Sequence, residues 1–318
     1  MPQPDLHRHR RFRQSRILIV GCGDVGLRAA QQLLPRCRVL ALTSSPERVA
    51  ALRAQGLTPL LGNLDDAGSL ARLAALAPRV LHLAPPPGQG ATDPRTARLL
   101  QALAHSGCRR GGRFAHGAPG GLRSLVYGST SGVYGDAQGA WVDETRATAP
   151  ATDRGRRRVD AERRVRAFGR RLALRHGGAA TVLRIPGIYA LDRDGGDPRE
   201  RVRKATPVLR TEDDVFTNHI HADDLARACV LALWRGRPGR VLHVCDDTEL
   251  RMGDHFDLVA DRFGLPRPPR LSRAEAAAVL SPMQMSFLGE SRRLRNQRMK
   301  GELRLALRYP TVSDGLVP

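Results

Sequence analysis

The chain has 318 residues, of which 41% are hydrophobic, and this content excludes a largely disordered protein. No apolar run approaches the ~20 residues that a membrane-spanning helix needs, and no apolar segment follows the basic N-terminus as it would in a secretory signal. The five cysteines are scattered without paired spacing, which favours a reducing compartment and predicts a cytoplasmic protein without a disulfide framework or a zinc site.

The formal net charge of +21 raises the question of nucleic-acid binding. Lysine occurs only at Lys204 and Lys300, so arginine supplies nearly all of the positive charge. The arginines are spread along the chain, and no zinc-finger, helix-turn-helix or RNA-recognition pattern accompanies their densest runs. Charge alone supports only a non-specific attraction to nucleic acid. We therefore expect no specific nucleic-acid partner.

A glycine-rich turn is the most informative local feature. Residues 17–20 form a continuous apolar run typical of a strand buried in a parallel sheet, and Gly21, Gly23 and Gly26 follow it. In this spacing the first glycine allows a tight turn, the second lets the backbone approach a pyrophosphate, and the third lets the helix pack close to the strand. The alternative is a turn that binds nothing. The strand before and the helix after favour a dinucleotide site.

The end of the next strand, expected at residues 38–43, bears on which dinucleotide binds. An acidic residue there would bind the ribose 2′-hydroxyl of NAD, whereas a basic residue nearby would accept the 2′-phosphate of NADP. The strand ends in Thr43 and Ser44 without an acid, and Arg48 follows one helical turn later. Residues 45–47 also fit a helix cap, and the two roles are compatible. We expect NADP rather than NAD.

Strands and helices alternate along most of the chain. The patterns predict further strands at residues 58–61, 79–84, 123–128 and 240–245, a strand and turn at 181–189, and helices at 47–55, 70–76, 93–105, 151–174 and 252–263. Another helix is expected to open within residues 218–226 and to end near residue 234. Residues 1–15 read as a disordered basic leader, and residues 106–122 and 190–213 as loops, the latter mobile. This alternation predicts an α/β protein with a doubly wound parallel sheet.

Four motifs follow one another along the chain. They are Gly-Cys-Gly-Asp-Val-Gly at 21–26, Ser-Thr-Ser-Gly-Val-Tyr-Gly-Asp at 129–136, Leu-Arg-Ile-Pro-Gly-Ile-Tyr at 183–189 and His-Ile-His-Ala-Asp-Asp-Leu-Ala at 219–226. In this order and spacing they resemble the extended short-chain dehydrogenase/reductases, the NAD-dependent epimerase/dehydratase superfamily. Residues 281–300, with Tyr-Pro-Thr at 309–311, resemble more narrowly the atypical bacterial branch named after YeeZ. The resemblance covers about residues 16–318.

The resemblance implies a division of the chain by function. Residues 16–189 would form an NAD(P)-binding Rossmann domain, to which residues 215–245 return. Residues 190–214 and 246–318 would form a small, mainly helical substrate-binding lobe. A substrate pocket is then expected between the carboxyl edge of the sheet and this lobe, because ligands of open α/β sheets bind at that edge.

The resemblance also implies which residues contact the cofactor. The glycine loop would hold the pyrophosphate, the residues after the second strand the adenosine ribose, and the ends of later strands the adenine and the nicotinamide. The expected cofactor residues are Gly21, Cys22, Gly23, Asp24, Val25, Gly26, Thr43, Ser44, Arg48, Asn63, Leu64, Ala84, Pro85, Arg158 and Ile185.

The catalytic residues depart from the family pattern. Thr130 occupies the position of the family's serine or threonine that hydrogen-bonds the reacting oxygen. The family's Tyr-x-x-x-Lys pair, however, is replaced by Arg154 and Arg158. A guanidinium stays protonated at any ordinary pH, so Arg154 cannot exchange the proton that the tyrosine exchanges. Tyr134 is the nearest phenol in the motifs and is the second catalytic candidate.

The histidines offer further candidates. His219 and His221 alternate beside Asp223, a pattern that could indicate a metal site, but a structural role is favoured because no third convergent ligand is evident. We predict no metal. His82, on an expected strand, is assigned to the core or the sheet surface rather than to catalysis.

Two functions remain open from the sequence. The first is an atypical NADP(H)-dependent oxidoreductase or epimerase-like enzyme, whose small-molecule substrate is a sugar nucleotide or another carbonyl or hydroxyl compound. The second is a non-catalytic NADP(H)-binding redox sensor or scaffold, which intact glycines and a lost Tyr/Lys pair also fit. Neither the substrate nor the oligomeric state follows from the residues.

Overall fold

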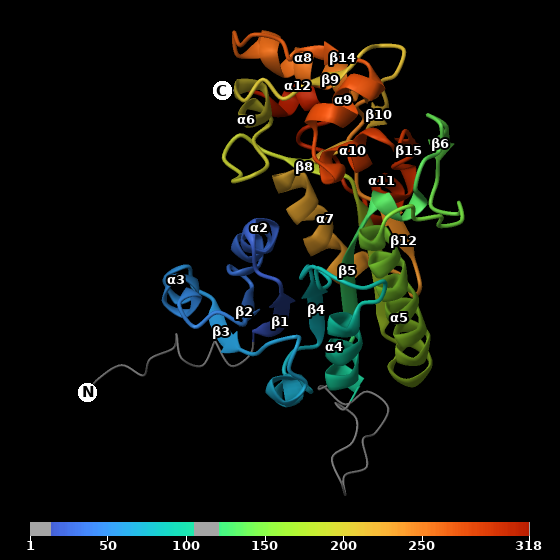
Figure 1. Cartoon of the computed structure of the whole chain (residues 1–318). Helices are drawn as coiled ribbons and strands as arrows, with labels where there is room; N and C mark the ends of the chain where they lie inside the picture. The colour runs from blue at the N-terminus through green and yellow to red at the C-terminus, as the bar shows by residue number, and fades with distance from the viewer. Residues whose placement is uncertain (1–13, 105–120, 318) are drawn as a thin grey trace, which may run out of the picture. The chain divides into compact units, whose positions relative to one another are not determined.

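The computed structural model describes residues 14–104 and 121–317 (Figure 1). The leader expected at residues 1–15 and the loop expected at 106–122 therefore lie, apart from residues 14–15 and 121–122, outside the described residues.

The glycine-rich turn follows a strand of a seven-stranded sheet, and the strand order of this sheet is the one expected of a doubly wound fold. From edge to edge the strands run β12-β7-β5-β4-β1-β2-β3, and β3, β2, β1, β4 and β5 pair in parallel. The chain reverses direction across the sheet at β1, as in dinucleotide-binding folds. The predicted fold class is confirmed. The strands are β1 (Ser15–Val20), β2 (Cys37–Thr43), β3 (Thr58–Leu61), β4 (Arg79–His82), β5 (Ser124–Thr130), β7 (Ala179–Ile185) and β12 (Val241–His243).

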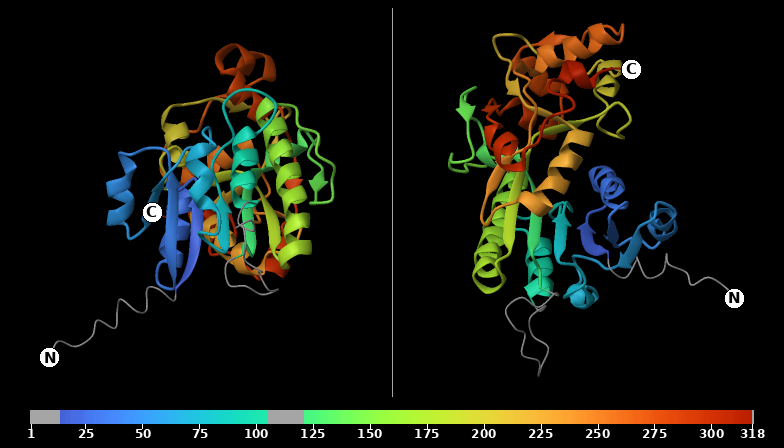
Figure 2. Two further views of the ribbon diagram at one scale, coloured as in Figure 1. Left: turned by 90° about the horizontal axis from the view of Figure 1, so that it is seen from below. Right: turned by 180° about the vertical axis from the view of Figure 1, so that it is seen from behind.

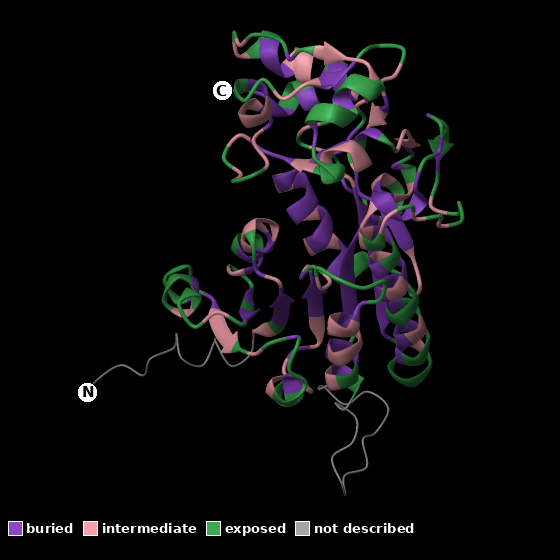
Figure 3. Ribbon diagram, in the orientation of Figure 1, coloured by how far each residue is buried: buried purple, intermediate pink, exposed green. Residues whose placement is uncertain are grey.

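Strand β1 lies inside the sheet between β2 and β4 and is buried on both faces. Ile17, Leu18 and Ile19 have no exposed surface, because each side of the strand is covered by packed apolar groups. Figure 2 shows β1, β2 and β4 side by side from two further directions, and Figure 3 shows these inner strands mostly in the colour of buried residues. A continuous apolar run is the sequence signature of such a central parallel strand.

Helices connect the strands and form much of the C-terminal half. They are α2 (Asp24–Leu33), α3 (Arg48–Ala54), α4 (Pro94–Ala104), α5 (Asp153–His176), α6 (Pro198–Arg203), α7 (Ala222–Arg235), α8 (Met252–Arg262), α9 (Arg273–Val279), α10 (Pro282–Leu288), α11 (Gln297–Leu303) and α12 (Val312–Gly315), with 3₁₀ turns η1 (Gly68–Leu73) and η3 (Ser131–Tyr134). No helix within the described ranges is long and apolar enough to cross a membrane.

Two sequence predictions of local structure were wrong. The helix expected at residues 70–76 is the 3₁₀ turn η1, which is followed by Ala75 at a left-handed φ of 58°. The segment 190–213, expected to be a mobile loop, contains α6 and the strand β9 (Val208–Leu209). Asp197 caps α6 by accepting a hydrogen bond from the amide of Arg199, and Pro198 begins the helix. Asp-Pro is a helix-start signal, so α6 was detectable in the sequence.

The described chain divides into two compact units. Unit 1 comprises residues 14–104, 121–129, 160–182 and 229–240, and unit 2 comprises residues 130–159, 183–228 and 241–317. The functional division into a cofactor domain and a substrate lobe stays a prediction. Unit 2 contains four two-stranded sheets, which pair β6 (Trp141–Val142) with β15 (Arg293–Leu294), β8 (Gly187–Tyr189) with β11 (His219–His221), β9 with β14 (Arg270–Leu271), and β10 (Phe216–Thr217) with β13 (Leu250–Arg251).

Candidate functional site

In unit 1 the glycine loop joins β1 to α2. Gly21 has a φ of +87°, and a Cβ there would lie 2.3 Å from the backbone nitrogen of Ala84. That nitrogen is close because Ala84 donates a hydrogen bond to the Val20 carbonyl oxygen at 3.0 Å. A Cβ on Gly26 would lie 2.9 Å from the Gly21 carbonyl oxygen. Both positions therefore require glycine to keep the loop, the helix and β4 close together.

Gly23 serves a different purpose, because a Cβ there would meet nothing within 4 Å. Its backbone borders open space at the start of α2. Gly23 is the N-cap of this helix and provides no side-chain hydrogen bond to the first amides. Uncapped amides and the positive end of the helix dipole together attract an anion. The structure thus leaves room for a phosphate where the sequence predicted one.

A pocket of about 370 Å³, here called the glycine-loop pocket, opens along this loop. It lies at the ends of β1, β2, β3 and β4, and its described lining contains two arginines and no acidic residue. The lining residues are Val20, Gly21, Cys22, Gly23, Leu42, Thr43, Ser44, Ser45, Arg48, Gly62, Asn63, Leu64, Leu83, Ala84, Pro85 and Arg95.

Arg48 is held at the glycine loop. Its Nη2 donates a hydrogen bond to the carbonyl oxygen of Cys22 at 2.7 Å, although the two residues are far apart in the sequence. Thr43 shapes the neighbouring turn, since its hydroxyl accepts from the Ser45 amide at 3.2 Å. A basic residue therefore borders the pocket at the end of β2, where an NAD-selective site would carry an acid.

Arg95 was missed in the sequence, because nothing near it in the chain signals a binding role. It lies in the first turn of α4, and its Nε and Nη2 donate to the two carboxylate oxygens of Asp65. This hydrogen bond lowers the pKa of Asp65. The pair orders the segment after β3, where the side chain of Asn63 also accepts from the Asp65 amide at 2.9 Å.

Most of the expected cofactor residues border this one pocket. Asp24, Val25 and Gly26 continue from it into α2, where Asp24 pairs with Arg28 at 3.0 Å. Arg158 and Ile185 belong to unit 2 and do not line the glycine-loop pocket. The contact of any of these residues with a cofactor stays a prediction.

Unit 2 contains a second pocket of about 390 Å³, here called the arginine pocket. Four arginines, one glutamate, several hydroxyl or amide groups and three phenylalanines surround it. Its lining residues are Thr130, Ser131, Gly132, Arg154, Arg158, Pro186, Gly187, Arg201, Phe216, Thr217, Asn218, His219, Met252, Phe256, Phe287, Glu290 and Arg292.

The two catalytic candidates have different surroundings. Thr130 lines the arginine pocket, and its Oγ1 accepts from the Gly132 amide at 3.2 Å, so its hydroxyl proton can be donated elsewhere. Tyr134 is 1% exposed and is absent from the pocket lining. The sequence motif places the two residues four positions apart, but only Thr130 borders a cavity.

The Tyr134 hydroxyl is committed to protein partners. Arg184 Nη1 donates to it at 2.6 Å, and His243 Nε2 lies at 2.6 Å. Burial lowers the pKa of His243 to about 4, so the ring is neutral and its Nδ1 donates to the Arg295 carbonyl at 2.9 Å. Nε2 is then an acceptor and receives a hydrogen bond from the Tyr134 hydroxyl. Tyr134 therefore ties together three segments of unit 2, and Thr130 is the better candidate for contact with a substrate.

His219 lines the arginine pocket and is 8% exposed. Its ring stacks on that of His255, with centroids 4.0 Å apart, and burial lowers the pKa of His219 to about 4. His221 accepts at Nδ1 from the Asp223 amide, as a structural residue would. No cluster of three metal-ligating side chains occurs among the described residues. His82 is buried and contacts Thr96 at 2.9 Å, within the core of unit 1.

Comparisons with known proteins support the fold and identify a relative. Residues 17–82 match the TrkA-N domain family. No curated protein matched the sequence. The UDP-glucose 4-epimerase of Thermotoga maritima, solved with UDP-glucose, is 18% identical with a TM-score of 0.73 over 95% of this chain and 96% of its own. The dTDP-glucose 4,6-dehydratase of Streptomyces venezuelae, solved with NAD, is 20% identical with a TM-score of 0.72 over 95% and 94%.

At these identities the two enzymes show a shared fold alone. A third structure is more similar in sequence: a conserved protein of unknown function from Silicibacter pomeroyi has 30% identity and a TM-score of 0.75. The match covers 95% of this chain and 97% of that one. The chain therefore belongs to the same family as this Silicibacter pomeroyi protein and has the Rossmann-type fold of the sugar-nucleotide epimerases and dehydratases.

Proposed function

We propose that the protein binds NADP(H) in the glycine-loop pocket and acts as an atypical oxidoreductase or epimerase-type enzyme of the short-chain dehydrogenase/reductase superfamily, on a small molecule in the cytoplasm. The observation that carries the proposal is the loop itself. Gly21 and Gly26 are required by close backbone contacts, whereas Gly23 faces open space at an uncapped helix start. A pyrophosphate fits this arrangement.

The preference for NADP rests on charge. The described lining of the glycine-loop pocket holds no acid. Arg95 is paired with Asp65, whereas Arg48 is hydrogen-bonded to a backbone carbonyl oxygen and is the cation that would face the 2′-phosphate. Thr43, Ser44 and Arg48 would bind the 2′-phosphate, Asn63 and Leu64 the adenine, and Ala84 and Pro85 the ribose beyond the pyrophosphate. The bound nicotinamide would supply hydride-transfer chemistry. The solved relatives of similar fold bind NAD or UDP-glucose, which supports a dinucleotide cofactor and makes a sugar nucleotide one substrate to assay.

The chain's own part in the chemistry falls to Thr130. Its hydroxyl can donate a hydrogen bond to a substrate oxygen, because the bond from the Gly132 amide uses an acceptor lone pair and leaves the hydroxyl proton available. Arg154 and Arg158 cannot take the proton that a tyrosine would exchange, since guanidinium groups stay charged. Water or a hydroxyl group would then exchange the proton in place of a phenol, unless the reaction needs no phenolic acid.

Calorimetric titration with NADPH and NADH tests cofactor binding. Gly23→Asp places a carboxylate where the pyrophosphate would bind, and we expect it to weaken NADPH binding more than about tenfold, because two anions then compete for one site. Gly301→Asp is the matched control, since a Cβ at this exposed position also meets nothing within 4 Å. Failure of the wild-type protein to bind either dinucleotide would overturn the proposal.

A second pair of variants tests cofactor preference. Arg48→Gln removes a charge-assisted hydrogen bond to the 2′-phosphate, so NADPH affinity should fall about 10- to 100-fold while NADH affinity changes little. Arg53→Gln, an exposed residue of the same helix outside the pocket, should change neither. Equal losses for both dinucleotides in Arg48→Gln would show that Arg48 only supports the loop.

A non-catalytic NADP(H)-binding sensor or scaffold is the second candidate. One observation favours it: Tyr134, the nearest phenol in the sequence motifs, has its hydroxyl engaged by Arg184 and His243. Turnover of NADPH with carbonyl and sugar-nucleotide substrates separates the two functions. Reproducible oxidation that falls in Thr130→Ala supports the enzyme, whereas tight cofactor binding without turnover supports the sensor.

A further inference from the structure

The arginine pocket carries positive charge that its own side chains do not neutralise. Arg154, Arg158, Arg201 and Arg292 line it, and Glu290 is the one acidic residue in its described lining. Glu290 is engaged by Arg292, whose Nη1 lies 2.8 Å from Oε2. This ion pair engages that carboxylate, so arginines outnumber acidic groups in the described lining of the pocket.

Arg154 shows the imbalance most clearly. Its guanidinium makes no hydrogen bond or ion pair with any described residue, and its Cζ lies 4.5 Å from the ring centroid of Phe287. Burial lowers the pKa of Arg154, and the charges of Arg158 and Arg292 lower it further against the opposing charge of Glu290. A partly buried cation beside two others is unfavourable unless an anion joins them.

Other donors in the pocket also lack acceptors. The Nε atoms of Arg201 and Arg292 are buried without a hydrogen-bond partner among the described residues. His219, more than nine-tenths buried, likewise has no partner for its Nδ1. The Thr130 hydroxyl keeps a proton to donate. Unsatisfied buried donors are rare in native proteins, and a cluster of them in a cavity indicates a ligand that accepts hydrogen bonds.

We infer that the arginine pocket binds the anionic group of a small molecule, a carboxylate or a phosphate, with Arg154 as its principal ligand and Thr130 as a hydroxyl donor beside it. As a substrate site this rests on the proposed function; anion binding itself does not. Arg154 and Arg158 stand four residues apart on α5, so the positions expected to hold the proton-transfer pair instead present two cations to the ligand.

The other residues that line the pocket indicate what the uncharged part of the ligand is like. Phe216, Phe256 and Phe287 border the same pocket and provide aromatic and apolar surface. A volume of about 390 Å³ suits a small metabolite. The ligand is thus expected to join a charged end to a carbon skeleton or a ring that packs against phenylalanine.

Isothermal titration in a chloride-free buffer tests the site, with inorganic phosphate and oxalate as the probes. We expect saturable binding of at least one of them, because either anion can be held by several guanidinium groups. The probe that binds more tightly shows whether the pocket prefers a phosphate or a carboxylate group. Arg154→Gln should weaken that binding at least tenfold, whereas Arg154→Lys should retain part of it as a point charge. Arg163→Gln, an exposed residue of the same helix, is the matched control.

The glycine loop could itself bind phosphate, so Gly23→Asp is titrated in parallel. Binding that survives in Gly23→Asp and is lost in Arg154→Gln assigns the anion to the arginine pocket. Three outcomes would overturn the inference. Binding could be lost in Gly23→Asp and survive in Arg154→Gln, Arg154→Gln could bind as well as the wild type, or neither probe could show saturable binding. NADPH titration of the same proteins reports on the proposed cofactor site separately, and circular dichroism shows whether each variant is folded.

Discussion

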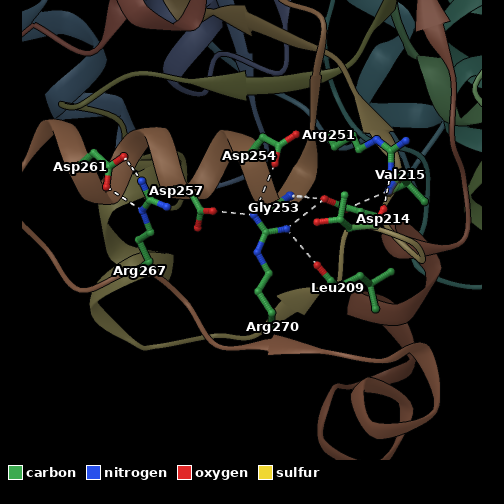
Figure 4. Close-up of polar contacts among 11 residues, drawn as sticks. Leu209, Asp214, Val215, Arg251, Gly253, Asp254, Asp257, Asp261, Arg267 and Arg270 are labelled. Carbon is green, nitrogen blue, oxygen red and sulfur yellow. Dashed lines mark hydrogen bonds and ion pairs between the residues drawn. The ribbon is translucent and has the colours of Figure 1, made fainter.

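Arg270 and Arg154, both in unit 2, differ in how the charges around them balance their own. Arg270 reaches three carboxylates: Nη2 lies 2.5 Å from Asp257 and 3.4 Å from Asp254, and Nη1 lies 3.4 Å from Asp214 (Figure 4). Nη1 also donates to the Leu209 carbonyl at 3.0 Å. Around Arg154, by contrast, the neighbouring charges are mostly arginines.

The pKa directions follow this difference. Burial opposes the charge of Arg270, but the hydrogen bond with Asp257 and the charges of Asp257 and Asp214 raise its pKa. Burial and like charges instead lower the pKa of Arg154. A cation whose partners are built into the fold stabilises the fold, whereas one without partners is available to a ligand. Arg270 is therefore a structural residue and Arg154 a binding residue.

The largest effect is expected at Arg270. Arg270→Met leaves Asp214, whose side chain is fully buried, without its cation, and removing one partner of a buried pair costs about 3–5 kcal/mol of unfolding free energy. Urea unfolding measures the loss. Arg267→Met breaks the exposed pair with Asp261, which Figure 4 shows nearby, and should leave stability unchanged. A small loss in Arg270→Met would mean that its charge is not structural.

Asp246 extends the comparison to a buried negative charge whose surroundings do not balance it. Asp246 is 4% exposed, and its Oδ2 has no hydrogen-bond partner among the described residues. Burial, with the nearby charges of Asp247 and Asp224, raises its pKa to about 7 against the hydrogen bonds from Thr248. Because the folded pKa exceeds the unfolded one, this group stabilises the fold at low pH, and that contribution is lost as the pH rises through about 7.

The wild-type free energy of unfolding should therefore fall by roughly 2–3 kcal/mol between pH 5 and pH 8 on account of Asp246. Asp246→Asn keeps the acceptor for the Thr248 amide, which Oδ1 binds at 3.0 Å, and removes the titration. Urea unfolding at both pH values compares the two proteins. An equal fall in the variant would assign the pH dependence to other groups.

The smallest effect on stability is expected at Arg154. Arg154→Gln removes a repulsive charge together with its contact to Phe287, so the unfolding free energy in anion-free buffer should change by no more than about 1 kcal/mol, in either direction. Thermal unfolding measures it beside Arg270→Met. A loss as large as that of Arg270→Met would make the Arg154 cluster structural and remove its contrast with Arg270.

Much of the fold was predictable because local pattern and topology agree. The limits of β3 match the predicted strand at residues 58–61, and the glycine loop lies between β1 and α2 as expected. The parallel order brings the ends of β1, β2 and β4 together, so residues such as Gly21, Thr43 and Ala84 border one pocket. The helix α6 was missed, although Asp197 and Pro198 form a helix-start signal in the sequence.

The residues by themselves determined the α/β class, because strand and helix patterns alternate along the chain, and the glycine loop, because it depends on spacing within a short segment. Only the tertiary structure decided that Tyr134 is buried against His243, that Arg95 borders the glycine-loop pocket, and that Arg201 and Arg292 join Arg154. Burial, and which charges lie beside which, depend on segments far apart in the chain. A charge's role follows from those neighbours, which no local pattern specifies.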